Sequence, residues 1–205
     1  MKGFILSLLT VFTTNVFATG MHPASDFVND TLTRGKQILE NKSEEYRRTN
    51  ICQLLKNRVH SSYIASVWLG DYRGLKRDQA GIKSFTGLIP SILVTKAVQA
   101  IGGGNKRAGF AVSPEASDRG NGYFDVAVTL QTRDGSHNGN AIVLQTKKGF
   151  MFVDVEYMGF SAVNYAAEEY QNILNEEYQR DPNRSLPVTA MVNRVAAQDG
   201  FIRCP

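Results

Sequence analysis

The sequence is poor in the residues that bind metals and perform nucleophilic catalysis. It contains only three histidines and two cysteines among 205 residues. His22, His60 and His137 lie far apart along the chain, and none has the spacing of a metal site. No G-x-S-x-G nucleophile elbow and no recognisable cysteine–histidine pairing occurs either. The sequence therefore predicts a protein without catalytic residues, without a metal and without a resident cofactor.

Signals for nucleotide and nucleic-acid binding are also missing. The glycine run at residues 102–104 is not followed by Lys and Ser or Thr, and it ends a predicted helix instead of opening one, so it does not match a phosphate loop. The formal net charge is only +4, from 23 Lys and Arg against 19 Asp and Glu. These cations are scattered, whereas nucleic-acid binding needs a concentrated basic patch with interleaved aromatics. We therefore predict no nucleic-acid partner.

Long apolar runs are absent beyond the N-terminus. Residues 1–18 combine a cation at Lys2, an apolar run and a small-residue cleavage site at Ala18, which is the layout of a secretory signal peptide. The run is too short and too interrupted by polar residues to span a bilayer as a stable helix. We expect cleavage near Ala18 and a mature chain, residues 19–205, that works outside the cytoplasm.

The only two cysteines, Cys52 and Cys204, both belong to the mature chain. In an oxidising compartment an even pair favours a disulfide, and the alternative is two unpaired thiols. The bond would close a loop of roughly 150 residues and stabilise the fold by on the order of 4–5 kcal/mol in the chain-entropy estimate. It would tie the C-terminus to an early helix.

Apolar residues repeat at helical spacing through residues 25–104, the first half of the mature chain. Ser25 is the expected N-cap of the first helix, and the second begins at about Ser43. A short helix over residues 61–69 and a long one over residues 77–101 complete this half.

The hydrophobic period changes from 3.6 to 2 in residues 107–157, which predicts an antiparallel sheet of about four strands. The clearest alternation places Phe124, Val126, Val128 and Leu130 on one face of a strand. Asn138-Gly139 is typical of a turn, so we expect the loop before the third strand there. The expected strands cover residues 107–113, 123–132, 141–147 and 150–157.

Residues 161–199 return to helical spacing, with Ser161 and Ser185 as the expected N-caps of two helices. The sequence has no internal repeat and no composition break, so we expect residues 19–205 to form a single domain. Helices followed by a sheet and further helices predict an α+β fold, with about six helices wrapped around a curved antiparallel sheet.

Four segments occur in an order that is found in a known family. They are residues 27–30, residues 64–72, Gln79 with Phe85 and Leu88, and residues 153–161. In this order, after a signal peptide, they resemble the MlaC family of periplasmic phospholipid-binding proteins, also called toluene-tolerance or auxiliary ABC-transport proteins. The chain departs from the family pattern at Met158, where an acidic residue is usual, and at Phe150, where Trp is usual. The cysteine pair is not a family hallmark.

The resemblance implies a soluble periplasmic carrier that moves a phospholipid between the outer membrane and an inner-membrane ABC transporter. The implied partners are that ABC lipid transporter complex and an outer-membrane lipoprotein–porin complex. The implied fold holds the acyl chains in a pocket between the curved sheet and the helices. Two acyl chains contain about 30 methylenes, whose transfer from water is worth roughly 20–25 kcal/mol. Release therefore requires docking to a membrane protein that alters the pocket.

Apolar side chains on two strand faces and on the helical stripes are the predicted lipid-binding residues. They are Trp68, Leu69, Tyr72, Phe85, Leu88, Ile89, Ile92, Phe124, Val126, Val128, Leu130, Val153, Val155 and Tyr157. The same pattern is also what a closed core between a sheet and its covering helices produces, so the sequence leaves both interpretations open. Arg73, Lys76 and Arg77 are candidates for contact with the headgroup phosphate.

Two other functions stay open at this point. An enzyme on a similar scaffold would use Asp125 or Asp154 beside a tyrosine, and it would be recognised by a raised carboxylate pKa inside a small cavity. A secreted interaction module would have a closed core without a cavity and would act through its surface.

Overall fold

The computed structural model describes residues 20–101, 109–132, 135–180 and 186–204, without the side chains of residues 97–101 and 132. The predicted signal peptide, residues 1–18, lies outside these ranges. The glycine run at residues 102–104 and the predicted cap Ser185 also lie outside them.

Six α-helices occur in the described part of the chain, as the sequence predicts. They are α1 (Pro23–Glu40), α2 (Glu44–Arg58), α3 (Ser61–Leu69), α4 (Gln79–Ile101), α5 (Ala162–Arg180) and α6 (Pro187–Ala196). Two 3₁₀ turns, Gly70–Gly74 and Lys76–Asp78, join α3 to α4. None of these described helices is long and apolar enough to cross a bilayer.

The predicted cap Ser161 is confirmed, and Ser43, where the second helix was predicted to begin, is the N-cap of α2. The Ser43 hydroxyl accepts a hydrogen bond from the Tyr46 amide at 3.2 Å, and the Ser161 hydroxyl accepts one from the Asn164 amide at 2.9 Å. Each bond satisfies one of the amides that the first turn of a helix leaves without an internal partner.

The predicted cap of the first helix is wrong. The helix begins three residues earlier than predicted, at Pro23, whose fixed φ suits a first helical position. The imidazole of His22 is the cap and accepts from the Ala24 amide at 3.2 Å. Ser25 lies inside α1, fully buried, and its hydroxyl has no hydrogen-bond partner.

Five antiparallel strands form one sheet in the order in which they follow along the chain. They are β1 (Gly109–Gly120), β2 (Tyr123–Thr132), β3 (Gly135–Thr146), β4 (Gly149–Tyr157) and β5 (Phe160–Ser161). The predicted meander is confirmed, and β5 adds a two-residue edge strand.

Two strand boundaries differ from the prediction. β1 continues to Gly120 instead of ending near residue 113, and β3 begins at Gly135 instead of residue 141. Asn138-Gly139 therefore lies inside β3 and is not a turn. Gly139 is there because the strands approach closely, and a Cβ at this position would lie only 2.6 Å from the backbone oxygen of Glu156.

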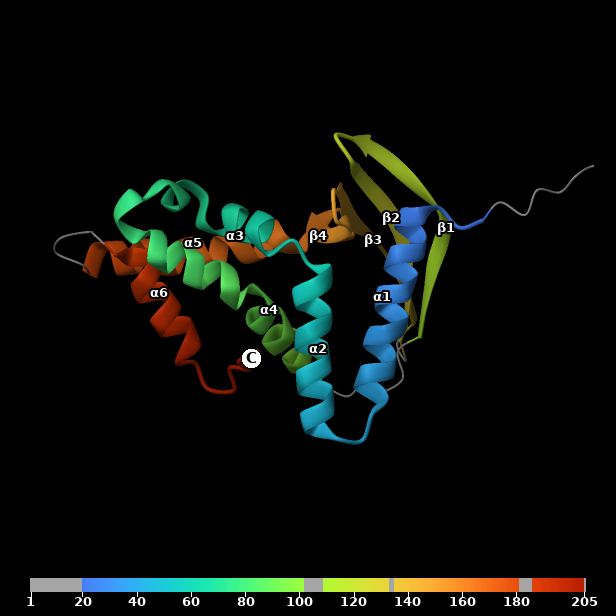
Figure 1. Cartoon of the computed structure of the whole chain (residues 1–205), viewed down its shortest axis with the longest axis horizontal. Coiled ribbons are helices and arrows are strands. Elements are labelled where there is room, and N and C mark those ends of the chain that lie inside the picture. The colour runs from blue at the N-terminus through green and yellow to red at the C-terminus, as the bar shows by residue number, and fades with distance from the viewer. Residues whose placement is uncertain (1–19, 102–108, 133–134, 181–185, 205) are drawn as a thin grey trace, which may run out of the picture.

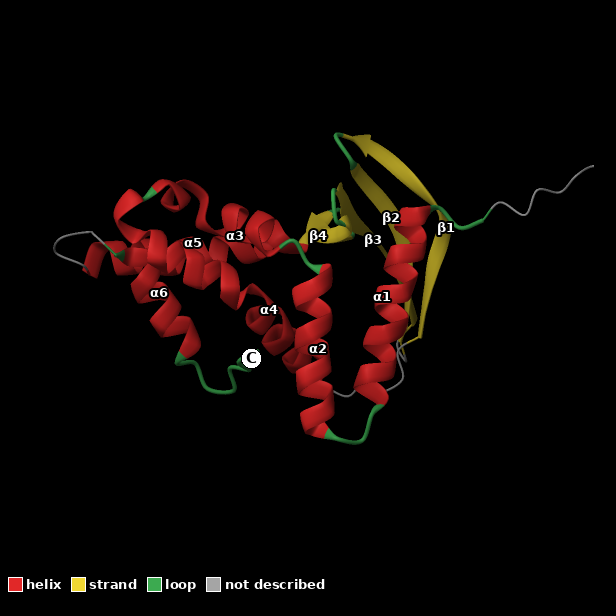
Figure 2. Ribbon diagram, in the orientation of Figure 1, coloured by secondary structure: helices red, strands yellow, loops and turns green. Residues whose placement is uncertain are grey.

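The helices are distributed unevenly around the sheet, as Figures 1 and 2 show. α1 lies along the sheet, and its residues Ala24 and Val28 form a small core with Val126, Ala141 and Val143. The helices α3 to α6 gather beside the sheet around a larger core of their own. Phe152 of β4 packs against both cores. The α+β class is confirmed, with a helical bundle and a helix-covered sheet joined side by side.

The predicted disulfide is confirmed. Cys52 of α2 and Cys204 near the C-terminus are bonded, with an S–S distance of 2.04 Å and a sequence separation of 152. The Cys204 amide donates to the Ser91 hydroxyl at 3.0 Å, and the Ile202 amide donates to the Thr95 hydroxyl at 2.9 Å. The C-terminal segment is therefore fixed to both α2 and α4.

Candidate functional site

An apolar cavity of about 410 Å³ lies between α1 and strands β2, β3 and β4. Cavities of roughly 300–1,000 Å³ are the usual size for small-molecule sites in proteins. The lining residues are Leu32, Val128, Leu130, His137, Gly139, Asn140, Ala141, Phe152, Val155, Glu156 and Tyr157. Most of these side chains carry no hydrogen-bonding group, so the cavity suits the apolar part of a ligand.

The strand register explains why these side chains meet. Leu130 pairs with His137, Val128 pairs with Gly139, and Gly139 pairs with Tyr157 on its other side. Residues paired across antiparallel strands project from the same face of the sheet. Gly139 contributes no side chain, which leaves space between its two larger neighbours.

A register shift in the β3–β4 ladder breaks the strict alternation of β4. Val143 pairs with Phe152 and Ala141 pairs with Val155, so Phe152 and Val155 both line the cavity although three positions separate them. Val153, which lies between them, is buried and does not line the cavity.

Large apolar side chains remain exposed at the cavity. Leu130 is 44% exposed, Val155 51% and Tyr157 45%. The Nδ1 atom of His137 lies 2.9 Å from the Tyr157 hydroxyl, which places one hydrogen-bonded polar pair on the wall. An apolar ligand would cover this surface, and each Å² removed from water is worth about 25 cal/mol.

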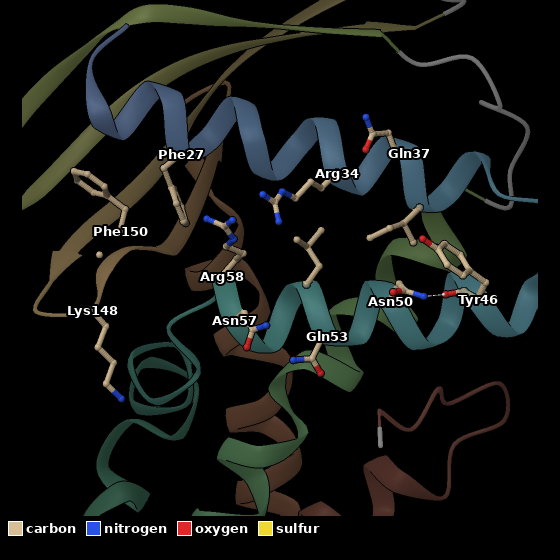
Figure 3. A pocket seen from close by; sticks show the side chains of 13 residues that line it. Phe27, Arg34, Gln37, Tyr46, Asn50, Gln53, Asn57, Arg58, Lys148 and Phe150 are labelled. Atoms are coloured by element: carbon tan, nitrogen blue, oxygen red, sulfur yellow. Dashed lines mark hydrogen bonds between the residues drawn. The ribbon is translucent and has the colours of Figure 1, made fainter.

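A second cavity, of about 600 Å³, lies between α1, α2 and the turn that joins β3 to β4 (Figure 3). Its lining residues are Phe27, Arg34, Gln37, Ile38, Tyr46, Asn50, Gln53, Leu54, Asn57, Arg58, Lys148, Gly149 and Phe150. Three of these residues are cationic and none is acidic. We refer to it as the cationic groove, and to the first cavity as the apolar cavity.

Two arginines face each other across the cationic groove. Figure 3 shows Arg34 extending from α1 and Arg58 from the end of α2 into the space between the helices, whereas Lys148 extends away from it. Asp30 bridges the two, with its Oδ1 2.8 Å from Nε of Arg34 and its Oδ2 2.7 Å from a terminal nitrogen of Arg58. The Arg58 guanidinium also lies 5.0 Å from the centre of the Phe27 ring. Two guanidinium groups and one carboxylate leave one positive charge in excess.

Three phenylalanines separate the cationic groove from the apolar cavity. Phe27 and Phe150 line the groove, and Phe152 lines the apolar cavity. The Phe27 ring lies 5.2 Å from that of Phe152 and 6.1 Å from that of Phe150, centre to centre. The two cavities are thus neighbours across one layer of aromatic rings.

The structure sorts the predicted lipid-binding residues into three places. Val128, Leu130, Val155 and Tyr157 line the apolar cavity. Val126 and Phe124 pack in the small core between α1 and the sheet. The helical residues form or flank the larger core and line neither cavity, namely Trp68, Leu69, Tyr72, Phe85, Leu88, Ile89 and Ile92. Val153 is buried and also lines neither cavity. For all of these residues, those that line the apolar cavity included, contact with a lipid stays a prediction.

The sequence reasoning missed the two arginines of the cationic groove. The basic residues it singled out, Arg73, Lys76 and Arg77, are exposed in the 3₁₀ turns and line neither cavity. Arg34 lies seven residues after Phe27 and therefore shares its face of α1. The sequence signal that could have identified Arg34 is a cation on the same helix face as an aromatic residue.

The two carboxylates considered for an enzyme have structural partners. Arg119 binds Asp125 and Glu156 across the sheet, and hydrogen bonds to Glu156 and then Asp125 raise the pKa of Arg119 above its ordinary value. Asp154 accepts a hydrogen bond from the Val163 amide at 3.0 Å. Neither Asp125 nor Asp154 lines either cavity. Among the described residues, no group of three or more His, Cys, Asp or Glu is placed to hold a metal ion.

Comparison with known proteins places the chain in a family. Residues 24–183 match the family model of the MlaC protein. The fold is similar to that of a phospholipid-binding protein from Ralstonia solanacearum, solved in complex with a phospholipid, with a TM-score of 0.64 at 12% identity over 84% of this chain and 96% of that one. No curated protein matches the sequence. Because the family model covers most of the chain, the protein belongs to the MlaC family.

Proposed function

We propose that the protein is a periplasmic phospholipid carrier, exported by the signal peptide at residues 1–18. It takes a phospholipid from one membrane and delivers it to the other, docking on an outer-membrane lipoprotein–porin complex and on an inner-membrane ABC lipid transporter. Membership of the MlaC family and the similarity to a structure that contains a phospholipid support this function. The lipid is cargo, and the proposal requires no catalytic residue.

The apolar cavity is the observation that carries the proposal. An interaction module that acts only through its surface would need no open apolar cavity. This chain has one, with walls formed by Val128, Leu130, Phe152 and Val155. Solvent contact at Leu130, Val155 and Tyr157 is unfavourable unless a ligand covers these side chains. An acyl chain is a ligand that matches such walls without needing hydrogen bonds.

The burial free energy of the acyl chains also determines how the lipid is released. A burial free energy of on the order of 10 kcal/mol per acyl chain would make escape into water extremely slow. Transfer becomes practical when a docked partner offers the chain another apolar environment and lowers the affinity of the cavity. Displacement of α1, which forms one wall of the cavity through Leu32, is the simplest such change.

Native mass spectrometry of the mature protein, purified without detergent, tests the function directly. We expect a stoichiometric adduct at the mass of a phospholipid, which denaturing extraction then releases for identification. A bare protein mass that stays unchanged after incubation with phospholipid vesicles would contradict the carrier function.

A matched pair of variants on β2 tests the apolar cavity as the binding site. Val128→Phe adds volume to the cavity wall, and we expect it to lower phospholipid occupancy at least about fivefold. Ala127→Phe places the same ring on the adjacent, exposed position of the strand and should leave occupancy unchanged. Equal occupancy in the two variants would place the acyl chains elsewhere.

A further inference from the structure

The cationic groove has the composition of an anion site. Its lining carries the guanidinium groups of Arg34 and Arg58, and its other polar side chains are amides, a lysine and a tyrosine. No carboxylate is among the lining residues, and although Asp30 bridges the two arginines, the three groups together keep one positive charge in excess, which attracts an anion. The lining also includes apolar side chains, among them Phe27, which lies next to the Arg58 guanidinium, and Phe150.

We propose that the cationic groove binds a phosphate group, held between Arg34 of α1 and Arg58 of α2. A guanidinium presents five donors in a planar fork that matches phosphate oxygens, and each of these two arginines uses a single donor on Asp30. Their remaining donors make no hydrogen bond to another described residue, so they can turn toward an anion in the space between α1 and α2 into which both side chains extend (Figure 3).

Burial strengthens the interaction of Arg58 with an anion more than that of Arg34. The Arg58 side chain is only 24% exposed and lies over the Phe27 ring, whereas the Arg34 side chain is 58% exposed. An ion pair formed in a partly desolvated place is screened less by water and salt than one on an open surface. Arg58 therefore supplies the stronger and better oriented contact, and Arg34 closes on the phosphate from the solvent side.

The phosphate can belong to a lipid headgroup or to a free anion. The headgroup source rests on the proposed carrier function and is favoured by position. Phe27 and Phe150 line the groove and contact or neighbour Phe152, which lines the apolar cavity. A phospholipid with its phosphate at the two arginines would lie with its acyl chains next to that aromatic layer.

Loading of two lipids that share their acyl chains but differ in the presence of the anionic phosphoglycerol headgroup tests the headgroup source. Purified mature protein is incubated with vesicles that contain either dioleoyl phosphatidylglycerol or dioleoylglycerol, and the bound lipid is measured. We expect Arg58→Gln and, separately, Arg34→Gln to lower the affinity for phosphatidylglycerol about tenfold and to leave that for dioleoylglycerol unchanged. Arg34→Gln alters an exposed side chain, so it serves where Arg58→Gln lowers stability.

Of two further variants, one is expected to raise the affinity for phosphatidylglycerol and the other to leave it unchanged. Asp30→Asn removes the carboxylate that competes for both guanidinium groups, so we expect it to raise the affinity for phosphatidylglycerol severalfold. Arg180→Gln removes an exposed arginine that pairs with Glu176 and Glu177 on α5, away from the groove, and should change nothing.

Calorimetric titration with inorganic phosphate separates the two sources. Binding of inorganic phosphate that Arg58→Gln abolishes, together with unchanged lipid loading, keeps the site and assigns it to a free anion. Unchanged affinity for both probes in the arginine variants overturns the anion site and leaves the carrier function intact. Failure of the wild-type protein to load either lipid overturns the carrier function, while the phosphate titration still decides the anion site.

Discussion

Asp78 shows how one buried charge can fix a helix. Its side chain is fully buried, and one oxygen accepts hydrogen bonds from the amides of Val188 at 2.7 Å and Thr189 at 3.0 Å. Those amides belong to the first turn of α6, which has no side-chain cap of its own. Gly81 makes the arrangement possible, because a Cβ there would collide with Asp78 and with the Thr189 amide. A residue before α4 thus caps a helix more than a hundred positions later.

Asp78→Ala tests this capping. The change leaves one buried amide, of Val188, and one partly buried amide, of Thr189, without an acceptor, so we expect the free energy of unfolding to fall by about 3 kcal/mol in urea denaturation. Asp71→Ala, which alters an exposed aspartate in the preceding 3₁₀ turn, is the control and should change it by less than about 0.5 kcal/mol. Equal effects of the two substitutions would contradict the role of Asp78.

The roles of single residues were the hardest part to predict from sequence. Apolar alternation in β2 correctly placed Val128 and Leu130 on one face, because the face of a strand residue follows from its position alone. Asp78, Arg34 and Arg58 act on partners brought to them by tertiary packing, and no local pattern identifies those partners. Ser25 failed as a cap for the opposite reason, because a local preference was overridden by the earlier start at Pro23.

At the scale of elements, Gly139 helps to determine the geometry of the apolar cavity although it has no side chain. It lies between Val128 and Tyr157 in the ladder and keeps β3 close to the backbone of β4 at Glu156. The sequence reasoning interpreted Asn138-Gly139 as a turn, since that pair is typical of hairpin loops. A glycine needed for close approach of two strands has the same sequence signature, so only the pairing distinguishes the two.

Two glycine-to-alanine substitutions should have opposite effects. Gly139→Ala forces β3 and β4 apart, so we expect a loss of about 2 kcal/mol in the free energy of unfolding and weaker lipid loading. Gly87→Ala lies at an exposed position of α4 with nothing within 4 Å of the new Cβ. There the better helix propensity of alanine should add about 0.5–1 kcal/mol. Chemical denaturation of both variants checks the signs, and stabilisation by Gly139→Ala would refute the close approach.

The hydrophobic period of the sequence predicted the positions of the helices and of the sheet well. All six helices lie close to their predicted spans, and the meander lies where the period changes to 2. The boundaries of β1 and β3 were less accurate, because residues beyond 113 and before 141 are too polar to show alternation and are held in the sheet by pairing with β2. The bulge that brings Phe152 into the apolar cavity has no sequence signature in this strand.

At the scale of the whole molecule, two parts must be held together. The helical core of α3 to α6 and the core under α1 share little apolar contact, with Phe152 packed against both. The disulfide joins α2, which packs against α1, to the C-terminal segment that hydrogen-bonds to α4. It therefore spans the boundary between the two parts and keeps α2 in place.

Removal of the disulfide should lower the free energy of unfolding of the whole protein but leave lipid binding unchanged. For a loop of 152 residues, the chain-entropy estimate gives about 5 kcal/mol. We expect the Cys52→Ser, Cys204→Ser double variant to lose close to that amount in urea denaturation, and reduced wild-type protein to match it. Neither cysteine lines a cavity, so lipid loading below the denaturation midpoint should persist. Loss of loading in a folded variant would show instead that the position of α2, and with it Arg58, depends on the bond. A loss of stability under about 1 kcal/mol would show that packing alone holds the two parts together.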